Sequence, residues 1–167
     1  MTSLNQLIRR ADGLIIKYLN GLPLEDKVRQ EKRIHFLKGL EDEVGLCKEG
    51  GTWGKGAQQF LWRIYDVREH INPKKVGQYI VEKPKEWGHY IGLLTGMFEF
   101  QPVFILNYGI HNLVSQELKF LMRYAPEFYE YVAKSIPPWQ VELSKRKGEL
   151  KERHRIAYNK LLASLSQ

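Results

Sequence analysis

Apolar residues recur at every third or fourth position through most of this sequence, and this spacing constrains the fold more than any other feature. In the first segment they stand at Leu4, Leu7, Ile8, Ala11, Ile15, Tyr18, Leu19 and Leu22. Such spacing places the apolar side chains on one face of an α-helix. The alternation that is typical of strands is confined to two short stretches, 78–81 and 98–104. We therefore predict an all-α fold.

Clusters of Gly, Pro and Asn divide the periodic pattern into about seven helices, because these residues end one helix and begin the next. The breaks fall at Asn20–Pro23, Glu49–Gly56, Asn72–Pro73, Gln101–Pro102, Tyr124–Pro126 and Pro137–Pro138. We expect a compact multi-helix bundle around a central apolar helix near 102–123, within a core domain of residues 1–138. Residues 139–167 are expected to form a basic C-terminal helix that packs on the same domain or on a partner.

The highly charged segment after Pro23 carries a sparser apolar stripe, which predicts which side of that helix is buried. The stripe consists of Ile34, Leu37, Leu40 and Val44. Two short helices are expected further along the chain, at 73–81 and 84–94, with Glu82 and Lys83 between them.

The composition excludes several classes of protein. The chain has 167 residues with a single cysteine, Cys47, which excludes an intramolecular disulfide framework and a thiolate zinc cluster. The first residues lack the basic region and apolar run of a signal peptide, and no apolar run approaches the ~20 residues of a membrane-spanning helix. We expect a cytoplasmic or otherwise intracellular protein that does not bind membranes.

The net charge of +7 is unevenly distributed, and its distribution suggests where an anionic partner binds. Residues 1–50 carry +1, residues 51–84 carry +3, residues 85–138 carry −1 and residues 139–167 carry +4. Two basic regions therefore flank a nearly neutral, aromatic-rich centre. Such asymmetry is typical of a phosphate-binding surface, although a solubilising surface gives the same sums.

The first basic group surrounds the two expected short helices and consists of Lys74, Lys75, Lys83 and Lys85. Two short helices joined by a tight turn resemble a helix-turn-helix, whose second helix enters the major groove of DNA. The match is partial, because Val81 occupies the turn position where glycine is favoured. The competing interpretation is a helical corner with solvated lysines.

The second basic group is the densest in the chain and consists of Lys145, Arg146, Lys147, Lys151, Arg153 and Arg155. In one interpretation these cations lie along nucleic-acid phosphates. In the other they form a solvated helix, balanced by the nearby glutamates. The +4 surplus of this segment favours phosphate.

A glycine-rich loop at 50–56 contains Trp53 and Lys55, which suit contact with an unpaired base. It is not a P-loop, because the spacing of its glycines is too short and no hydroxyl residue follows the lysine. The alternative is a helix connector whose Trp53 folds back onto the core.

Metal, cofactor and catalytic motifs are sparse. A single Glu-x-x-His, at Glu86 and His89, is half of what a di-iron bundle needs, so we expect no metal and no cofactor. Nucleophile motifs are missing as well. Glu41 and Glu43 are candidate catalytic acids, but acids this close in a helix point in different directions and more often form a solvated surface.

These observations lead to three hypotheses. The first is a non-catalytic nucleic-acid-binding protein, DNA or RNA, that is a small subunit of a nucleoprotein assembly and contacts the phosphate backbone with little sequence readout. The second is a protein-interaction or structural subunit that uses residues 139–167 to bind a protein partner or a second copy. The third is a small hydrolase acting on an anionic polymer.

Overall fold

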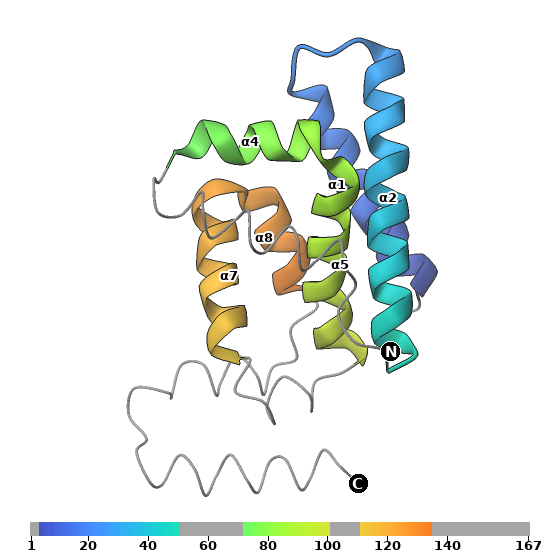
Figure 1. Ribbon diagram of the computed structural model, residues 1–167, viewed down its shortest axis with the longest axis vertical. Helices are drawn as coiled ribbons and strands as arrows, with labels where there is room; N and C mark the ends of the chain where they lie inside the picture. The colour runs from blue at the N-terminus through green and yellow to red at the C-terminus, as the bar shows by residue number, and fades with distance from the viewer. Residues whose placement is uncertain (1–3, 51–71, 101–110, 135–167) are drawn as a thin grey trace, which may run out of the picture.

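The computed structural model describes residues 4–50, 72–100 and 111–134, which form six helices and no strand (Figure 1). The helices are α1 (Leu4–Asn20), α2 (Asp26–Lys48), α4 (Pro73–Glu82), α5 (Pro84–Phe100), α7 (His111–Tyr124) and α8 (Pro126–Ala133). Within these ranges the all-α prediction is confirmed. Residues 78–81 and 98–100, which also fit a strand pattern, are helical.

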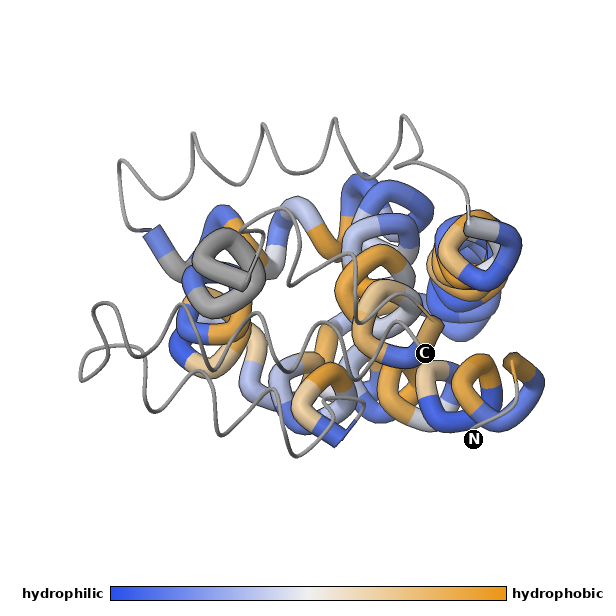
Figure 2. The backbone as a smooth tube through the Cα atoms, turned by 90° about the horizontal axis from the view of Figure 1, so that it is seen from below, coloured by the Kyte–Doolittle hydropathy of each residue, from blue (hydrophilic) through white to orange (hydrophobic). Residues whose placement is uncertain are grey.

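Helix α1 buries the apolar stripe that its sequence predicts. Leu7, Ala11, Ile15 and Leu19 are spaced four residues apart and are all buried. In Figure 2, hydrophobic and hydrophilic residues tend to fall on different sides of the described helices. Helix α1 ends at Asn20, three residues before Pro23, as expected.

Helices α2 and α5 form the closest helix pair, and glycines make this approach possible. A Cβ atom added at Gly39 would lie 2.0 Å from the carbonyl oxygen of Lys85, and one added at Gly88 would lie 2.0 Å from that of Phe36. A Cβ at Gly92 would lie 2.7 Å from the carbonyl oxygen of Leu40. The two backbones are therefore in direct contact, which only residues without a side chain permit.

The predicted buried side of α2 is partly wrong. Leu40 and Val44 are buried as expected, but Ile34 is 60% exposed. The buried side is instead continued by Phe36, Gly39, Glu43 and Cys47. The physical reason is the contact with α5, which turns the glycine and the glutamate inward although neither belongs to an apolar stripe.

Helix α5 is the most buried helix among the described residues, whereas residues 102–110 of the predicted central helix at 102–123 lie outside them. It begins at Pro84 as expected but continues to Phe100, and twelve of its 17 residues are buried. Helix α7, which covers part of the predicted central helix, exposes 54% of Met122. The glycines of α5 contribute to its burial, because they allow the backbone of α2 to approach a face of α5 that larger side chains would keep at a distance.

Helix α8 connects the two ends of the described chain through aromatic contacts. The Phe128 ring meets the rings of Tyr18, Phe36 and Trp87 edge-to-face, at centroid distances of 5.6, 5.9 and 5.0 Å. The Tyr131 hydroxyl donates a hydrogen bond to the carbonyl oxygen of Leu7, at 3.1 Å. Helix α8 therefore packs against α1, α2 and α5 at once.

Candidate functional site

The described residues carry only a small part of the net charge. They include 16 basic and 14 acidic residues, a net charge of +2, whereas the whole chain carries +7. A functional surface in this part of the protein must therefore come from the local gathering of charges and not from their total.

Four of the predicted site residues, Lys74, Lys75, Lys83 and Lys85, are described, and all four are exposed. The others lie outside the described residues. These are Trp53, Lys55, Lys145, Arg146, Lys147, Lys151, Arg153 and Arg155. The structure therefore bears on the first basic group only.

The helix-turn-helix interpretation of α4 and α5 is wrong. In that motif the second helix presents an exposed face to the major groove. Helix α5 is buried along most of its length, and its residues 87–98 are all buried except the half-buried His89. The pair α4–α5 is instead a corner whose second helix belongs to the core.

The lysines of the first basic group are divided between the two ends of α4. Lys74 and Lys75 lie in its first turn, where the Asn72 side chain caps the helix by accepting a hydrogen bond from Lys74 N at 3.1 Å. Lys83 and Lys85 lie just beyond its last residue. Ten residues of helix span about 15 Å, so the four lysines do not form one compact cluster.

Lys32 of α2 lies at the α4–α5 corner, where its ammonium group stabilises the end of α4 and is not available to bind a phosphate. Its Nζ donates a hydrogen bond to the carbonyl oxygen of Val81, in the last turn of α4. A cation at this position satisfies a free carbonyl group and stabilises the negative end of the helix dipole.

Helix α7 carries an exposed stripe that the sequence analysis did not single out. Its members are Gln116, Lys119, Met122 and Arg123. They are spaced three or four residues apart and therefore share one face of the helix. The acidic residue of this helix, Glu117, is 1% exposed and accepts a hydrogen bond from the Tyr90 hydroxyl in the core. The exposed charges of α7 between residues 116 and 124 are therefore all positive.

The start of α4 and helix α7 lie on the same side of the molecule, as the two views of Figures 1 and 2 show. We call Lys74, Lys75, Lys119 and Arg123 the basic face. Sequence reasoning missed two of its members because residues 85–138 have a net charge of −1. That sum includes the charge of Glu117, which the fold removes from the surface.

Arg123 is also held by an aromatic contact. Its guanidinium carbon lies 5.4 Å from the centroid of the Tyr124 ring, which is a cation–π geometry. The Tyr124 ring in turn packs against Phe120, with the ring centroids 5.2 Å apart. The exposed cation is thus supported by the core beneath it.

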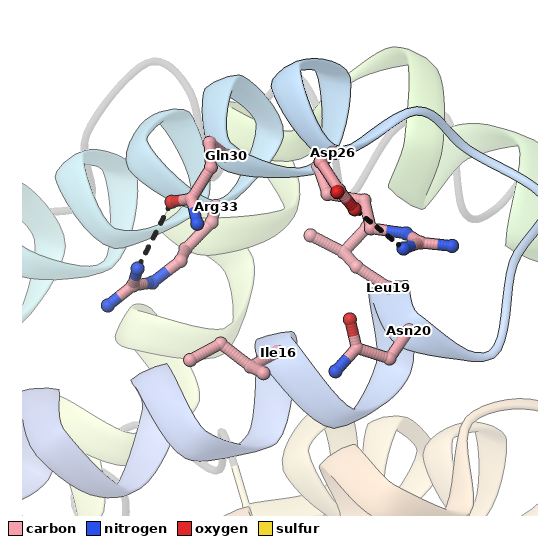
Figure 3. A pocket seen from close by; sticks show the side chains of 7 residues that line it. Ile16, Leu19, Asn20, Asp26, Gln30 and Arg33 are labelled. Carbon is pink, nitrogen blue, oxygen red and sulfur yellow. Dashed lines mark hydrogen bonds and ion pairs between the residues drawn. The ribbon is translucent and has the colours of Figure 1, made fainter.

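A half-open pocket of about 240 Å³ lies between α1 and α2 (Figure 3). Its lining includes the apolar side chains of Ile16 and Leu19 and the charged side chains of Asp26, Arg29 and Arg33. Both arginines form ion pairs with carboxylates. Arg29 pairs with Asp26, with a nitrogen–oxygen distance of 3.2 Å, and Arg33 pairs with Asp12. The side-chain hydrogen bond to Asp12 also raises the pKa of Arg33. The pocket therefore offers no surplus of positive charge for a phosphate.

The two candidate catalytic acids do not act as a pair. Glu41 is exposed, whereas the Glu43 side chain is fully buried and its Oε1 lies 3.1 Å from Nδ1 of His89. The two carboxylates therefore point to different sides of α2, and they do not share a cleft as a two-acid hydrolase requires. Among residues 4–50, 72–100 and 111–134, no three His, Cys, Asp or Glu side chains are grouped as metal ligands.

In the described part of the chain, no helix is long and apolar enough to cross a membrane. Neither a protein-family model, nor a curated protein sequence, nor a solved structure matches this chain significantly.

Proposed function

We propose that this protein binds the phosphate backbone of nucleic acid with little sequence readout, as a non-catalytic subunit of a larger nucleoprotein assembly. One observation carries the proposal for the described residues. Helix α7 exposes Lys119 and Arg123, the first turn of α4 exposes Lys74 and Lys75, and the one acidic residue of α7, Glu117, is buried. The backbones of these two segments lie on the same side of the molecule (Figure 1).

The chemistry of such a face suits a polyanion. Each cation that neutralises a phosphate releases condensed counterions, and this release supplies most of the affinity of non-specific binding. Exposed lysines and arginines that are not engaged in ion pairs are available for such contacts. Among the described residues, no acidic partner lies within ion-pair distance of the basic face.

The burial of α5 supports the proposal of weak sequence readout. Direct readout requires a helix or ribbon whose exposed side chains reach the base edges in the major groove. Helix α4 is short and α5 is in the core, so this corner supplies no recognition helix. The proposal keeps the predicted contacts of Trp53 and Lys55 and of the basic segment 145–155, which lie outside the described residues.

The full-length protein tests the proposal in a salt titration of binding, using fluorescence anisotropy of a labelled DNA strand of about 16 nucleotides. The logarithm of the binding constant is expected to fall linearly with the logarithm of salt concentration between about 50 and 200 mM. An affinity that hardly changes over this range contradicts phosphate contact. Self-association or partner binding that is lost on deletion of residues 139–167, without any nucleic-acid binding, supports the interaction-subunit hypothesis instead.

A further inference from the structure

The exposed stripe of α7 is not purely basic, and its apolar member calls for a separate explanation. Met122 is 54% exposed and, with Ile34, is one of two large hydrophobic side chains that the described residues expose. It lies one helical turn from Lys119 and directly beside Arg123. An apolar side chain at this position does not contribute to the binding of a phosphate.

Arg123 offers a second surface that suits a base. Its guanidinium is exposed but is held over the ring of Tyr124, at 5.4 Å from the centroid. A planar cation that is supported on one side by an aromatic ring has its other side available for stacking. Arginine planes and aromatic rings are the groups on which proteins stack unpaired bases.

The combination distinguishes a single strand from a duplex. In a duplex the base faces are stacked on one another, so a surface that binds a phosphate backbone meets only charges and sugar. In a single strand each base has an open apolar face that can contact a polarisable thioether and a guanidinium plane. One helical turn, about 5.4 Å, separates Lys119 from Arg123, so phosphate and base contacts fall on the same short stretch of helix.

We propose that the basic face binds single-stranded nucleic acid, with Met122 and Arg123 contacting an unpaired base and Lys119 contacting an adjacent phosphate. This inference rests on the proposed function and names its substrate class. The cations provide attraction to any strand, and the Met122–Arg123 surface provides the preference for an unpaired one.

The experiment compares three DNA probes of about 16 nucleotides: an oligothymidine strand, a strand of the same charge without bases, and a duplex. The variants are Met122→Ala and Arg123→Lys, which retains the charge but removes the planar group. Ile34→Ala and Arg9→Lys are matched controls, because both residues are exposed and lie on α2 and α1. Circular dichroism checks that every variant is folded.

The wild-type protein is expected to bind oligothymidine more tightly than the duplex. Met122→Ala and Arg123→Lys should each weaken binding of oligothymidine by about fivefold or more, while binding of the strand without bases and the salt dependence stay unchanged. Tighter binding of the duplex, or variants that weaken the two single strands equally or not at all, overturns this inference and leaves phosphate binding intact. Failure of the wild-type protein to bind any probe at low salt overturns the proposed function, and this inference with it.

Discussion

The fully buried carboxylate of Glu43 on α2 lies 3.1 Å, from Oε1 to Nδ1, from the ring of His89 on α5. The glycines of the helix pair place the two side chains together. A Cβ at Gly92 would lie 3.1 Å from the Glu43 Cβ, and a Cβ at Gly39 would lie 3.0 Å from the backbone nitrogen of His89. The same close approach that forms the core therefore also provides its buried polar contact.

Removal of the His89 ring is expected to destabilise the fold. A buried carboxylate that loses a hydrogen-bond partner retains the cost of its desolvation, so His89→Ala should lower the free energy of unfolding by about 3 kcal/mol. Glu43→Gln retains a hydrogen-bonding oxygen without a charge and should cost about 1 kcal/mol. Urea unfolding monitored by circular dichroism measures both. The exposed His35→Ala is the control, and a His89→Ala variant no less stable than this control contradicts the role of the pair.

Replacing a glycine by alanine should change the stability in opposite directions inside and outside the α2–α5 contact. Gly88→Ala places a methyl group 2.0 Å from the Phe36 carbonyl oxygen, so the helices must separate and the stability should fall by about 3 kcal/mol. Gly13→Ala, in α1, meets no atom within 4 Å and should raise the stability by about 0.5–1 kcal/mol, because alanine is the better helix former. Thermal unfolding of the two variants compares them directly. Equal shifts of the melting temperature would show that α2 and α5 are not in backbone contact.

The buried thiol of Cys47 and the buried phenol of Tyr131 should make the protein less stable at alkaline pH. Burial, together with the charge of Glu43, raises the pKa of the Cys47 thiol from 9.0 to about 12, and burial raises the pKa of Tyr131 from 10.0 to about 12. The folded state thus holds these protons more tightly than the unfolded state. The stability they contribute is fully present below pH 9 and is lost as the pH rises toward 12.

The measurement is the free energy of unfolding as a function of pH above pH 9, for the wild-type protein and for a Cys47→Ala, Tyr131→Phe double variant. The double variant loses the Tyr131–Leu7 hydrogen bond and is less stable at every pH, so the slope is compared and not the absolute value. We expect a shallower decline with pH in the variant. An identical slope means that neither group titrates differently in the folded and unfolded states.

Apolar periodicity predicted the helices well where burial follows hydropathy alone. In α1 every fourth residue from Leu7 to Leu19 is apolar and buried, so the stripe and the fold agree. The start of α4 was also predictable, because Asn72 and Pro73 form a cap with a direct physical mechanism. The strand pattern at 78–81 and in the described part of the second stretch, 98–100, was too short to compete with the surrounding helical periodicity.

The α2–α5 contact was not predicted, although the sequence contains a signal for it. Gly88, Gly92 and Gly96 are spaced four residues apart and therefore lie on one face of a helix. A search for apolar side chains passes over this pattern. For the same reason Ile34 was assigned to the buried side of α2 in place of Gly39 and Glu43.

The basic face was only half predicted, because charge was summed along the sequence. Lys74 and Lys75 stood out as part of a basic segment, whereas Lys119 and Arg123 lie in a segment of net negative charge. Whether an acidic residue offsets a neighbouring cation depends on its burial. The position of Glu117 in the core is a property of the tertiary structure and cannot be read from the charge pattern.

If the basic face contacts phosphates, its cations set the slope with which nucleic-acid binding weakens as the salt concentration rises. The variant carries Lys74→Gln, Lys75→Gln, Lys119→Gln and Arg123→Gln. The control carries Arg9→Gln, Lys17→Gln, Lys27→Gln and Lys38→Gln, which remove the same charge from exposed positions on α1 and α2. With a single-stranded probe, the loss of the three phosphate contacts of Lys74, Lys75 and Lys119 should reduce the slope of log K against log salt by about 2.1, while the control changes it little. Equal changes of slope in the two proteins would show that net charge, and not the basic face, governs binding, and would contradict phosphate contact by this face.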